Sequence, residues 1–374
     1  MNTLGIDKLE SQTRVVVAMS GGVDSSVTAG LLAEQGYDVV GITLKLYDHG
    51  EAIKRRGACC AGQDIHDARR VADTLNIPHY VLNYQARFRR DVIEKFADAY
   101  ARGTTPIPCV ACNRTVKFRD LMSTAQDLGA DALATGHYVR RIFGARGPEL
   151  HRAVDSTRDQ SYFLFATTPA QLEYLRFPLG DLSKDEVRRH GERLCLPVAA
   201  KPDSQDICFV PDRDYVRVVR RLRPEASNPG DIVDCMGNVL GRHKGIGGFT
   251  IGQRRGLGIC GADAPLYVLA IDPATRRVVV GPKSALARAS VACTDVNWLV
   301  SVPDHGISVE VKLRSMQTTV AATLFGQSDN RAEVILAVPQ IAVAPGQACV
   351  FYNGDRLLGG GWIARDGETE FAAA

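Results

Sequence analysis

The sequence lacks long hydrophobic runs, an excess of charge of either sign and a high density of cysteine. No apolar run reaches the ~18 residues of a membrane span, and the polar N-terminus has no apolar core like that of a signal peptide. Basic (45) and acidic (42) residues nearly balance, so bulk charge alone does not indicate a nucleic-acid partner. Ten cysteines in 374 residues are too few for a disulfide scaffold. We expect a cytoplasmic globular protein whose close cysteine pairs serve redox, metal or catalytic chemistry.

The first half of the chain alternates strand-like and helix-like segments. Short β-branched runs predict strands at 15–19, 39–44, 79–82 and 132–135. Helical periodicity starts at Asp24 and recurs at 66–75 and 115–128. This alternation predicts an α/β domain with a parallel sheet covered on both faces.

The pattern changes after Asp203. From Asn228 the chain is rich in glycine and predicts a small β or loop-rich module. Strand patterns at 308–313, 318–325, 331–338 and 348–352, separated by turn signals, predict a small antiparallel barrel or sandwich. We therefore expect three domains, at 1–210, 211–285 and 286–374.

The segment AMSGGVDSS follows the first strand and opens a helix. Gly21 and Gly22 leave room for backbone N–H groups around phosphate oxygens, and Ser20 and Ser25 add hydroxyl donors at a helix N-terminus. The segment is neither a Walker A loop nor a dinucleotide fingerprint. The structural alternative is a glycine turn with a helix cap.

Two cysteine motifs follow. Cys109 and Cys112 form a C-x-x-C pair in GTTPIPCVACNRTVKF, just before the helix expected at Thr115. The helix dipole, Arg114 and Lys117 should lower the pKa of a cysteine placed there and make it a thiolate nucleophile. Cys208 lies far away in sequence, in KPDSQDICFV.

Together these motifs resemble the tRNA-specific 2-thiouridylase family, within the superfamily of N-type ATP pyrophosphatases. The resemblance continues through ATGHY, RDQSYFL, FPLG, HKGIGGFTIGQRRGLG and APGQACVFYNGDRLLGGGWI, so it covers nearly the whole chain in order. It implies a nucleotide-binding catalytic domain, a small central domain that contacts tRNA and a C-terminal β-barrel. The implied reaction adenylates the C2 oxygen of the wobble uridine and replaces it with sulfur, which yields 2-thiouridine, AMP and pyrophosphate.

The resemblance also assigns residue roles. Cys112 matches the nucleophile, and Cys208 the cysteine that carries sulfur as a persulfide and forms a transient disulfide with Cys112. Asp24 matches the residue that holds Mg²⁺ on the pyrophosphate. The residues that match ATP contacts are Ala18, Met19, Ser20, Gly21, Gly22, Val23, Asp24, Ser25, Leu44 and Gly136. Those that match tRNA contacts are Ile107, Pro108, Cys109, His137, Arg158, Asp159, Gln160, Arg314, Ser315 and Gln347.

One position departs from the family pattern. Many members carry an aspartate with an acid–base role where this chain has Cys109. Cys109 is then a variant acid–base group or a bystander. A third reading is that Cys109, Cys112 and Cys208 hold a 4Fe–4S cluster with one open iron, since three thiolates suffice for that.

Two other functions remain as alternatives. The chain could be a different ATP pyrophosphatase, such as a small-molecule ligase, but the paired cysteines argue against this. It could instead be an RNA-binding module without catalysis, which leaves the phosphate loop without a purpose. The resemblance to the 2-thiouridylase family implies ATP and Mg²⁺ as cofactors. Its partners would be wobble-uridine tRNAs for lysine, glutamate and glutamine, and a persulfide donor such as a cysteine desulfurase or a relay protein.

Overall fold

A computed structural model describes residues 1–47, 60–203, 207–210, 212, 214–259, 264–341 and 343–365. Cys59, the side chain of Cys60, Cys260 and the stretch 204–206 of the DSQDIC motif lie outside the described residues. The chain forms two compact units. The first comprises Met1–Val92, Cys109–Phe209 and Asp355–Leu357, and the second comprises Ile93–Pro108, Val210–Gly354 and Leu358–Ala374.

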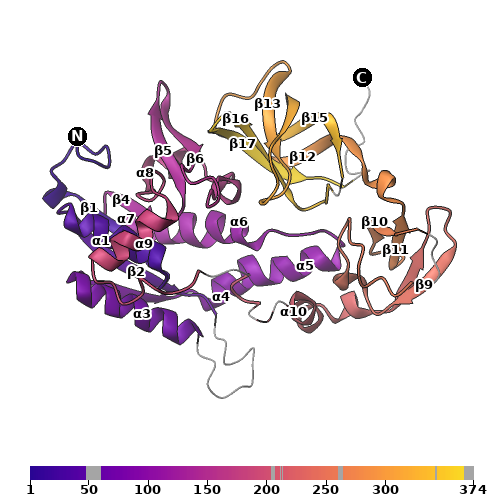
Figure 1. Cartoon of the computed structure of the whole chain (residues 1–374), viewed down its shortest axis with the longest axis horizontal. Helices are drawn as coiled ribbons and strands as arrows, with labels where there is room; N and C mark the ends of the chain where they lie inside the picture. The colour runs from indigo at the N-terminus through magenta and orange to yellow at the C-terminus, as the bar shows by residue number, and fades with distance from the viewer. Residues whose placement is uncertain are drawn as a thin grey trace. The chain divides into compact units, whose positions relative to one another are not determined.

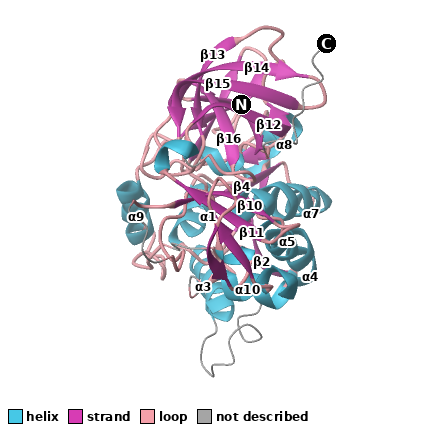
Figure 2. Ribbon diagram, turned by 90° about the vertical axis from the view of Figure 1, so that its right-hand side faces the viewer, coloured by secondary structure: helices cyan, strands magenta, loops and turns pink. Residues whose placement is uncertain are grey.

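The first unit is built on a five-stranded parallel sheet, as the sequence predicted. Its strand order is β3-β2-β1-β4-β7. Val15, Val16 and Val17 of β1 are all fully buried, because helices cover both faces of a parallel sheet. Figure 2 shows α9 and α7 on opposite sides of this sheet. The strands are β1 (Arg14–Ala18), β2 (Asp38–Lys45), β3 (His79–Asn83), β4 (Ala132–Thr135) and β7 (Leu175–Arg176).

One face of the sheet carries a helical layer. Val15 and Val17 share a hydrophobic core with Val27 of α1, Val71 of α3 and Val187 of α9. These contacts fix the start of α1, and with it the loop that precedes it, at the carboxyl end of β1 (Figure 1). The helices of the unit include α1 (Val23–Glu34), α3 (Cys60–Leu75), α4 (Gln85–Phe88), α8 (Pro169–Tyr174) and α9 (Lys184–Arg193).

The helix expected at 115–128 is longer than its amphipathic pattern indicates. It begins at Pro108 as α6 (Pro108–Cys112), continues as a π-helical segment, η3 (Asn113–Leu121), and ends as α7 (Met122–Asp127). The reason lies at its start, because proline is favoured in the first helical turn, where its missing N–H is not needed. Cys109 and Cys112 are therefore inside the helical run and not in a loop before it.

The first unit also contains a hairpin that the sequence reading missed, β5 (Val139–Gly144) with β6 (Gly147–Arg152). The sequence carries no strand signal here because β5, with the sequence VRRIFG, does not alternate regularly between apolar and polar residues. Phe143 is exposed, and the Arg141 guanidinium lies 4.4 Å from the centre of its ring. A cation thus covers the ring where a buried core would otherwise be expected.

The second unit contains a small mixed sheet with the order β10-β11-β8-β9. Ile232, Val268 and Val280 are fully buried in its core, together with Ile246 and Phe249 from the glycine-rich segment. The module contains α10 (Tyr215–Leu222), β8 (Gly230–Val233), β9 (Val239–His243), β10 (Tyr267–Asp272) and β11 (Arg277–Gly281). Helix α5 (Lys95–Ala101) also belongs to this unit, and Tyr100 stacks on Tyr215 of α10.

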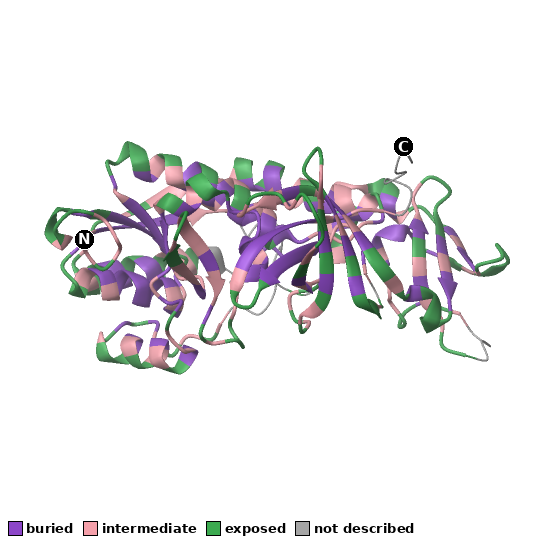
Figure 3. Cartoon of the chain, turned by 90° about the horizontal axis from the view of Figure 1, so that it is seen from above, coloured by how far each residue is buried: buried purple, intermediate pink, exposed green. Residues whose placement is uncertain are grey.

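The same unit ends in a six-stranded antiparallel barrel. Its order is β12-β15-β14-β13-β16-β17, and β12 also pairs with β17, which closes it. Buried residues alternate with half-buried or exposed ones along β13 and β14, and Figure 3 shows strands of the chain on which buried and exposed residues alternate in this way. The sequence reading missed β12, and it missed β17 because three consecutive glycines interrupt the pattern. The strands are β12 (Arg288–Trp298), β13 (Ile307–Lys312), β14 (Val320–Gln327), β15 (Arg331–Gln340), β16 (Ala348–Asn353) and β17 (Arg356–Ile363).

No helix in the described part of the chain is long and apolar enough to cross a membrane.

Candidate active site

The phosphate loop connects β1 to α1 and is shaped by one glycine. Gly21 is buried with φ +77°, and a Cβ there would lie 2.2 Å from the Asp64 carbonyl oxygen. Both the backbone conformation and the close approach of α3 therefore require glycine. Inside the loop, the Ser25 hydroxyl accepts a hydrogen bond from the Ser20 N–H at 3.0 Å. The loop is thus held by its own serines while Ser20 stays exposed.

The loop lies where the sheet order reverses. Strands β2 and β3 extend from one side of β1, and β4 pairs with its other side. Ligands of open parallel sheets bind at this position, beyond the carboxyl ends of the strands. Leu44 is near the carboxyl end of β2, and Gly136 follows β4 directly. A Cβ on Gly136 would lie 2.8 Å from the Asp24 carbonyl carbon, so this glycine allows β4 to approach the start of α1.

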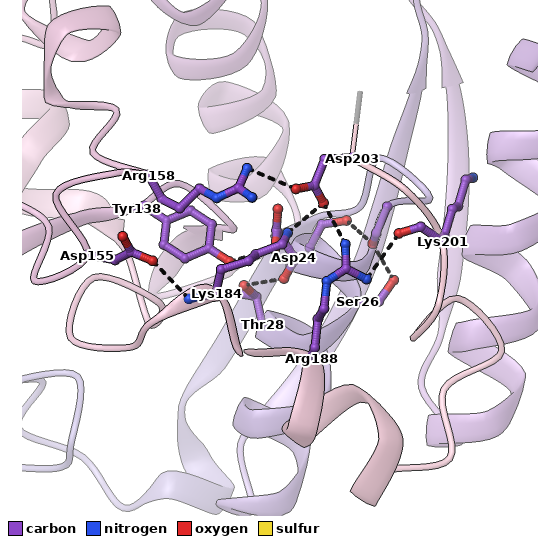
Figure 4. A network of polar contacts seen from close by, with 12 residues as sticks. Asp24, Ser26, Thr28, Tyr138, Asp155, Arg158, Lys184, Arg188, Lys201 and Asp203 are labelled. Carbon is purple, nitrogen blue, oxygen red and sulfur yellow. Dashed lines mark hydrogen bonds and ion pairs between the residues drawn. The ribbon is translucent and has the colours of Figure 1, made fainter. Parts of the chain in front are cut away.

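The Asp24 carboxylate contacts a lysine and a tyrosine (Figure 4). Lys184 Nζ and the Tyr138 hydroxyl each donate to Asp24 Oδ1 at 2.7 Å. Burial, reinforced by the Asp24 carboxylate, raises the pKa of Tyr138, so the phenol stays protonated as a donor. Lys184 was not found from the sequence. Its only local signal is the capping box Ser183–Glu186, which marks a helix start and not a site.

Lys184 also contacts a second carboxylate, that of Asp203, at 2.7 Å. Arg158 and Arg188 add ion pairs to Asp203 at 3.0 and 3.3 Å. Burial alone would raise the pKa of Asp203, but the Lys184 hydrogen bond and the surrounding cations lower it overall. Asp203 therefore remains ionised at the centre of three positive side chains.

Lys201, also unassigned from the sequence, contacts the phosphate loop directly. Its ammonium donates to the Gly21 carbonyl at 2.9 Å and to Asp64 and Asp67 at 2.7 Å each. Burial opposes its charge, but the two carboxylates raise its pKa overall. The segment Lys201–Asp203 is thereby attached to the loop and to α3.

The structure brings the three predicted cysteines together. Cys109 and Cys112 lie three residues apart on one helical run, and Cys208 is close enough that their negative charges would raise its pKa. We call Cys109, Cys112 and Cys208 the cysteine group. All three are free thiols; Cys112 is buried, while Cys109 and Cys208 reach solvent from crowded surroundings. Two motifs separated by 96 positions thus share one location.

The expected lowering of the cysteine pKa is wrong in sign. Burial raises the pKa of Cys109 and Cys112, and it raises that of Cys208 to about 12. Lys117 opposes this in all three cases, and a Tyr47 hydrogen bond also lowers the pKa of Cys208. Cys112 is the fifth residue of the helical run, too far from the first turn to gain much from the dipole. At neutral pH the cysteine group is protonated.

The other candidate tRNA residues of the first unit have internal partners. His137 Nδ1 lies 2.8 Å from the Thr135 hydroxyl, and its ring lies edge-on to those of Phe118 and Phe177. Burial lowers the pKa of His137 well below its usual value, so it is a neutral group and not a cation for a phosphate. The segment 158–160 is mainly fixed by hydrogen bonds: Asp159 accepts from the Ser161 hydroxyl at 2.8 Å and Gln160 from the Tyr138 N–H at 2.9 Å.

The remaining tRNA candidates belong to the second unit. Ile107 and Pro108 are buried. Arg314 is exposed after β13 and donates to the Ile341 carbonyl at 3.3 Å, while the neighbouring Ser315 is half-buried. Lys312 pairs with Val350, so Arg314 lies at the end of the barrel where β16 begins and where Gln347 precedes it. The Gln347 amide donates to the Thr105 carbonyl at 2.9 Å.

The fold and the site together define a class of protein. It has a parallel α/β nucleotide-binding unit with a glycine-containing phosphate loop at the point where the strand order reverses. The chain belongs to the tRNA-specific 2-thiouridylase family. Proteins of that name from Rhodospirillum centenum and Paracoccus denitrificans are 63% and 60% identical, over 98% and 97% of this chain and 95% of each relative. The relative from Parvibaculum lavamentivorans is 59% identical over 98% of this chain and 94% of its own length.

Family models match three successive segments. Residues 13–212 match a tRNA methyl transferase HUP domain, 218–282 a tRNA methyl transferase PRC-barrel domain and 288–363 an aminomethyltransferase beta-barrel domain. Among solved structures, the chain is similar to a 4-thiouridine synthetase–RNA complex with bound ATP, with a TM-score of 0.37 and 16% identity over 57% of this chain and 51% of that one.

Proposed function

We propose that this chain is an ATP-dependent tRNA uridine 2-sulfurtransferase that forms 2-thiouridine at the wobble position. The observation that carries the proposal is the cysteine group, because two distant motifs converge in the same unit as the phosphate loop. Curated relatives named for tRNA 2-thiolation match nearly the full chain. The family model that matches residues 13–212 is named for a tRNA methyl transferase. Methyl transfer needs no pair of thiols, so the cysteine group favours sulfur transfer.

The phosphate loop serves the first step, adenylation. The uridine C2 oxygen attacks the α-phosphorus of ATP and pyrophosphate leaves. Backbone N–H groups around Gly21 and Gly22, with the Ser20 hydroxyl, bind the pyrophosphate oxygens. Adenylation is needed because the uridine oxygen is a poor leaving group, whereas AMP is a good one.

Asp24 suits the role of magnesium ligand. Mg²⁺ in nucleotide sites binds one or two carboxylates and otherwise phosphate oxygens and water, so a single partly exposed carboxylate fits. Bound there, Mg²⁺ would neutralise charge on the phosphates.

The donor set does not fit an iron–sulfur cluster. In the described ranges, no group of three or more His, Cys, Asp or Glu side chains is placed to hold a metal. The geometry therefore favours the two-cysteine reading, and we derive no step through a cluster. Cys109 is then a neighbour of the reacting thiols.

The cysteine group serves the second step. Cys208 receives a sulfur atom from a persulfide donor, and the terminal sulfur reaches C2 directly or as released sulfide while AMP leaves. In both routes the bond between the outer sulfur and the Cys208 sulfur must be cleaved with two electrons. The Cys112 thiol supplies them by attacking the Cys208 sulfur, which forms a Cys112–Cys208 disulfide, and an external reductant then restores both thiols. Because burial keeps both thiols protonated, the cysteines need a change of surroundings or a base to react. The proposed substrates are wobble-uridine tRNAs for lysine, glutamate and glutamine, and the donor is a cysteine desulfurase or a relay protein.

The test is thiolation of a wobble-uridine tRNA transcript by anaerobically purified protein with ATP and a persulfide donor. Nucleoside mass spectrometry would report 2-thiouridine, and released AMP and pyrophosphate would report adenylation. We expect Cys208→Ser to adenylate without thiolating, Cys112→Ser to lose sulfur transfer, and Cys109→Ser to stay active. Cys195→Ser, at an exposed thiol outside the cysteine group, is the matched control.

Each result separates the alternatives. Full thiolation by Cys208→Ser would refute the persulfide role. Loss of activity in Cys109→Ser, together with iron and acid-labile sulfide in the wild type, would restore the cluster reading. ATP turnover without any effect of tRNA would indicate a small-molecule ligase, and tRNA binding without ATP turnover would indicate a binding module.

A further inference from the structure

The second unit contains a hollow that belongs neither to the phosphate loop nor to the cysteine group. We call it the basic hollow. Its volume is about 370 Å³, and its lining comes from α10, the end of β9, the short 3-10 helix η6 (Ile246–Gly248) and the segment 256–258. Three exposed cations line it, Arg220, Arg242 and Lys244, and no carboxylate does so among the described residues. The lining therefore carries positive charge only.

Two of these cations have no partner for their charge. The side chains of Arg220 and Lys244 make no ion pair or hydrogen bond within the described part of the chain, whereas Arg242 lies 3.4 Å from the Asp231 carboxylate. Arg220 comes from α10 and Lys244 follows β9, so separate elements bring these charges to one place. Convergence on a hollow distinguishes them from cations scattered over a surface.

The glycines of the lining leave its backbone accessible. Neither conformation nor packing requires glycine at 248, because its φ is not in the left-handed region and an added Cβ would meet one atom within 4 Å, Val216 Cγ2 at 3.9 Å. The N–H groups of Gly256, Leu257 and Gly258 have no acceptor among the described residues. Successive N–H groups of this kind bind anions, and glycine permits a ligand to approach the backbone closely.

A buried histidine holds the loop after β9 in shape. His243 Nδ1 accepts a hydrogen bond from the Gly245 N–H at 3.0 Å, so Nε2 carries the proton and donates to the Arg276 carbonyl at 3.0 Å. Burial lowers the pKa of His243, which keeps the ring neutral. A Cβ on Gly245 would lie 2.3 Å from the Ala226 carbonyl oxygen, so the loop packs directly on the preceding segment. The basic hollow is therefore formed without a ligand.

The lining suits a phosphate group better than a nucleoside. Its aromatic side chains, His243 and Phe249, are buried with their ring centres 5.3 Å apart, so neither offers an open face for a base to stack on. No described carboxylate is present in the lining to bind ribose hydroxyls. Cations and backbone N–H groups are the partners that proteins use for the phosphates of a nucleic-acid backbone.

We propose that the basic hollow binds a backbone phosphate of tRNA, separately from the candidate contacts Arg314 and Gln347. The inference rests on the proposed tRNA substrate. Arg220 and Lys244 supply the charge, the N–H groups of 256–258 supply directed donors, and Gly248 leaves room for the phosphate to approach. Such a contact orients the RNA and raises its affinity without reading its sequence.

The first test removes charge and measures binding of a wobble-uridine tRNA transcript to the full-length protein by filter binding across a salt series. We expect Arg220→Gln and Lys244→Gln each to weaken binding several-fold and to flatten the slope of log affinity against log salt by about one. Arg221→Gln is the matched control, because this exposed arginine is the next residue of α10 and does not line the basic hollow. An equal loss in the control would indicate a general charge effect and would overturn the site.

The second test fills the space without changing charge. We expect Gly248→Ala to weaken tRNA binding several-fold while urea unfolding stays as in the wild type. Gly241→Ala is the control: its Cβ also meets one atom, Ile259 Cγ1 at 3.9 Å, its φ is also outside the left-handed region, and it does not line the basic hollow. Wild-type affinity in folded Gly248→Ala, or in both charge variants, would overturn the proposal. If Gly248→Ala does not fold, the charge variants decide.

Two further measurements separate the possible sources of phosphate and the two proposals. Calorimetry of AMP binding should show no site in the wild type that Lys244→Gln lacks; such a site would assign the basic hollow to free nucleotides and overturn the RNA source. A wild type that does not bind tRNA contradicts the proposed function and this site together. A wild type that binds and thiolates tRNA, with normal binding in the hollow variants, contradicts the site alone.

Discussion

Lys117 is the residue that opposes burial throughout the cysteine group. It lies in η3, half-buried, and its charge lowers the pKa of Cys109, Cys112 and Cys208. Burial still dominates, because removing a thiolate from water costs more than one nearby cation returns. The reactivity of these thiols therefore depends on how much of the positive charge near them is retained.

We expect Lys117→Gln to shift the alkylation profiles of Cys112 and Cys208 to higher pH. Loss of the ammonium raises both pKa values, and below the pKa the rate falls roughly tenfold for each unit. The measurement is maleimide alkylation between pH 7 and 10, resolved by peptide mass spectrometry. Arg114→Gln is the control, since this exposed side chain is three residues earlier and should leave the profiles in place. An unshifted profile in Lys117→Gln would remove the electrostatic role.

At the scale of elements, β4 and α1 approach each other at Gly136. The glycine has no unusual backbone angle, so its role is close packing and not conformational freedom. The family resemblance marks the same position as a nucleotide contact, and the packing gives a physical reason for glycine there. A side chain would act first on the start of α1, and through it on Asp24 and the phosphate loop.

We expect Gly136→Ala to weaken binding of an ATP analogue several-fold, because its Cβ would displace the backbone at Asp24 and Ser25. Isothermal calorimetry measures the affinity. Gly36→Ala is the control: Gly36 follows α1 with φ +88° and has nothing within 4 Å of its added Cβ. That variant should cost about 1 kcal/mol of stability from the positive φ and leave nucleotide affinity unchanged. Equal affinities in both variants would contradict the packing argument.

At the scale of the whole molecule, the chain divides its tasks between two units. The first holds the phosphate loop, the ion pairs of Lys184 with Asp24 and Asp203, and the cysteine group. The second holds the small mixed sheet and the barrel. The residues Ile93–Pro108 belong to the second unit although their neighbours in sequence belong to the first, and Gln347 is bonded to Thr105 within them. We propose that the barrel reads tRNA through the end that carries Arg314 and Gln347.

We expect Arg314→Ala to weaken tRNA binding without changing ATP affinity. Loss of one phosphate contact should also flatten the slope of log affinity against log salt by about one. Filter binding across a salt series measures both quantities. Arg331→Ala is the control, because this exposed arginine follows the turn at the opposite end of the barrel. Unchanged affinity and slope in Arg314→Ala would exclude this end of the barrel as an RNA contact.

Local patterns determined much of this protein. The β-branched run of β1, the glycine loop and the start of α1 were predictable because each depends on neighbours in sequence. The same holds for the parallel sheet and the barrel strands β13 to β16. Tertiary structure alone decided the partners of Asp24, because Lys184 is 160 positions away, and the sign of the cysteine pKa shifts. Desolvation and charge pairing depend on which distant segments pack together, and residue spacing carries no information about that.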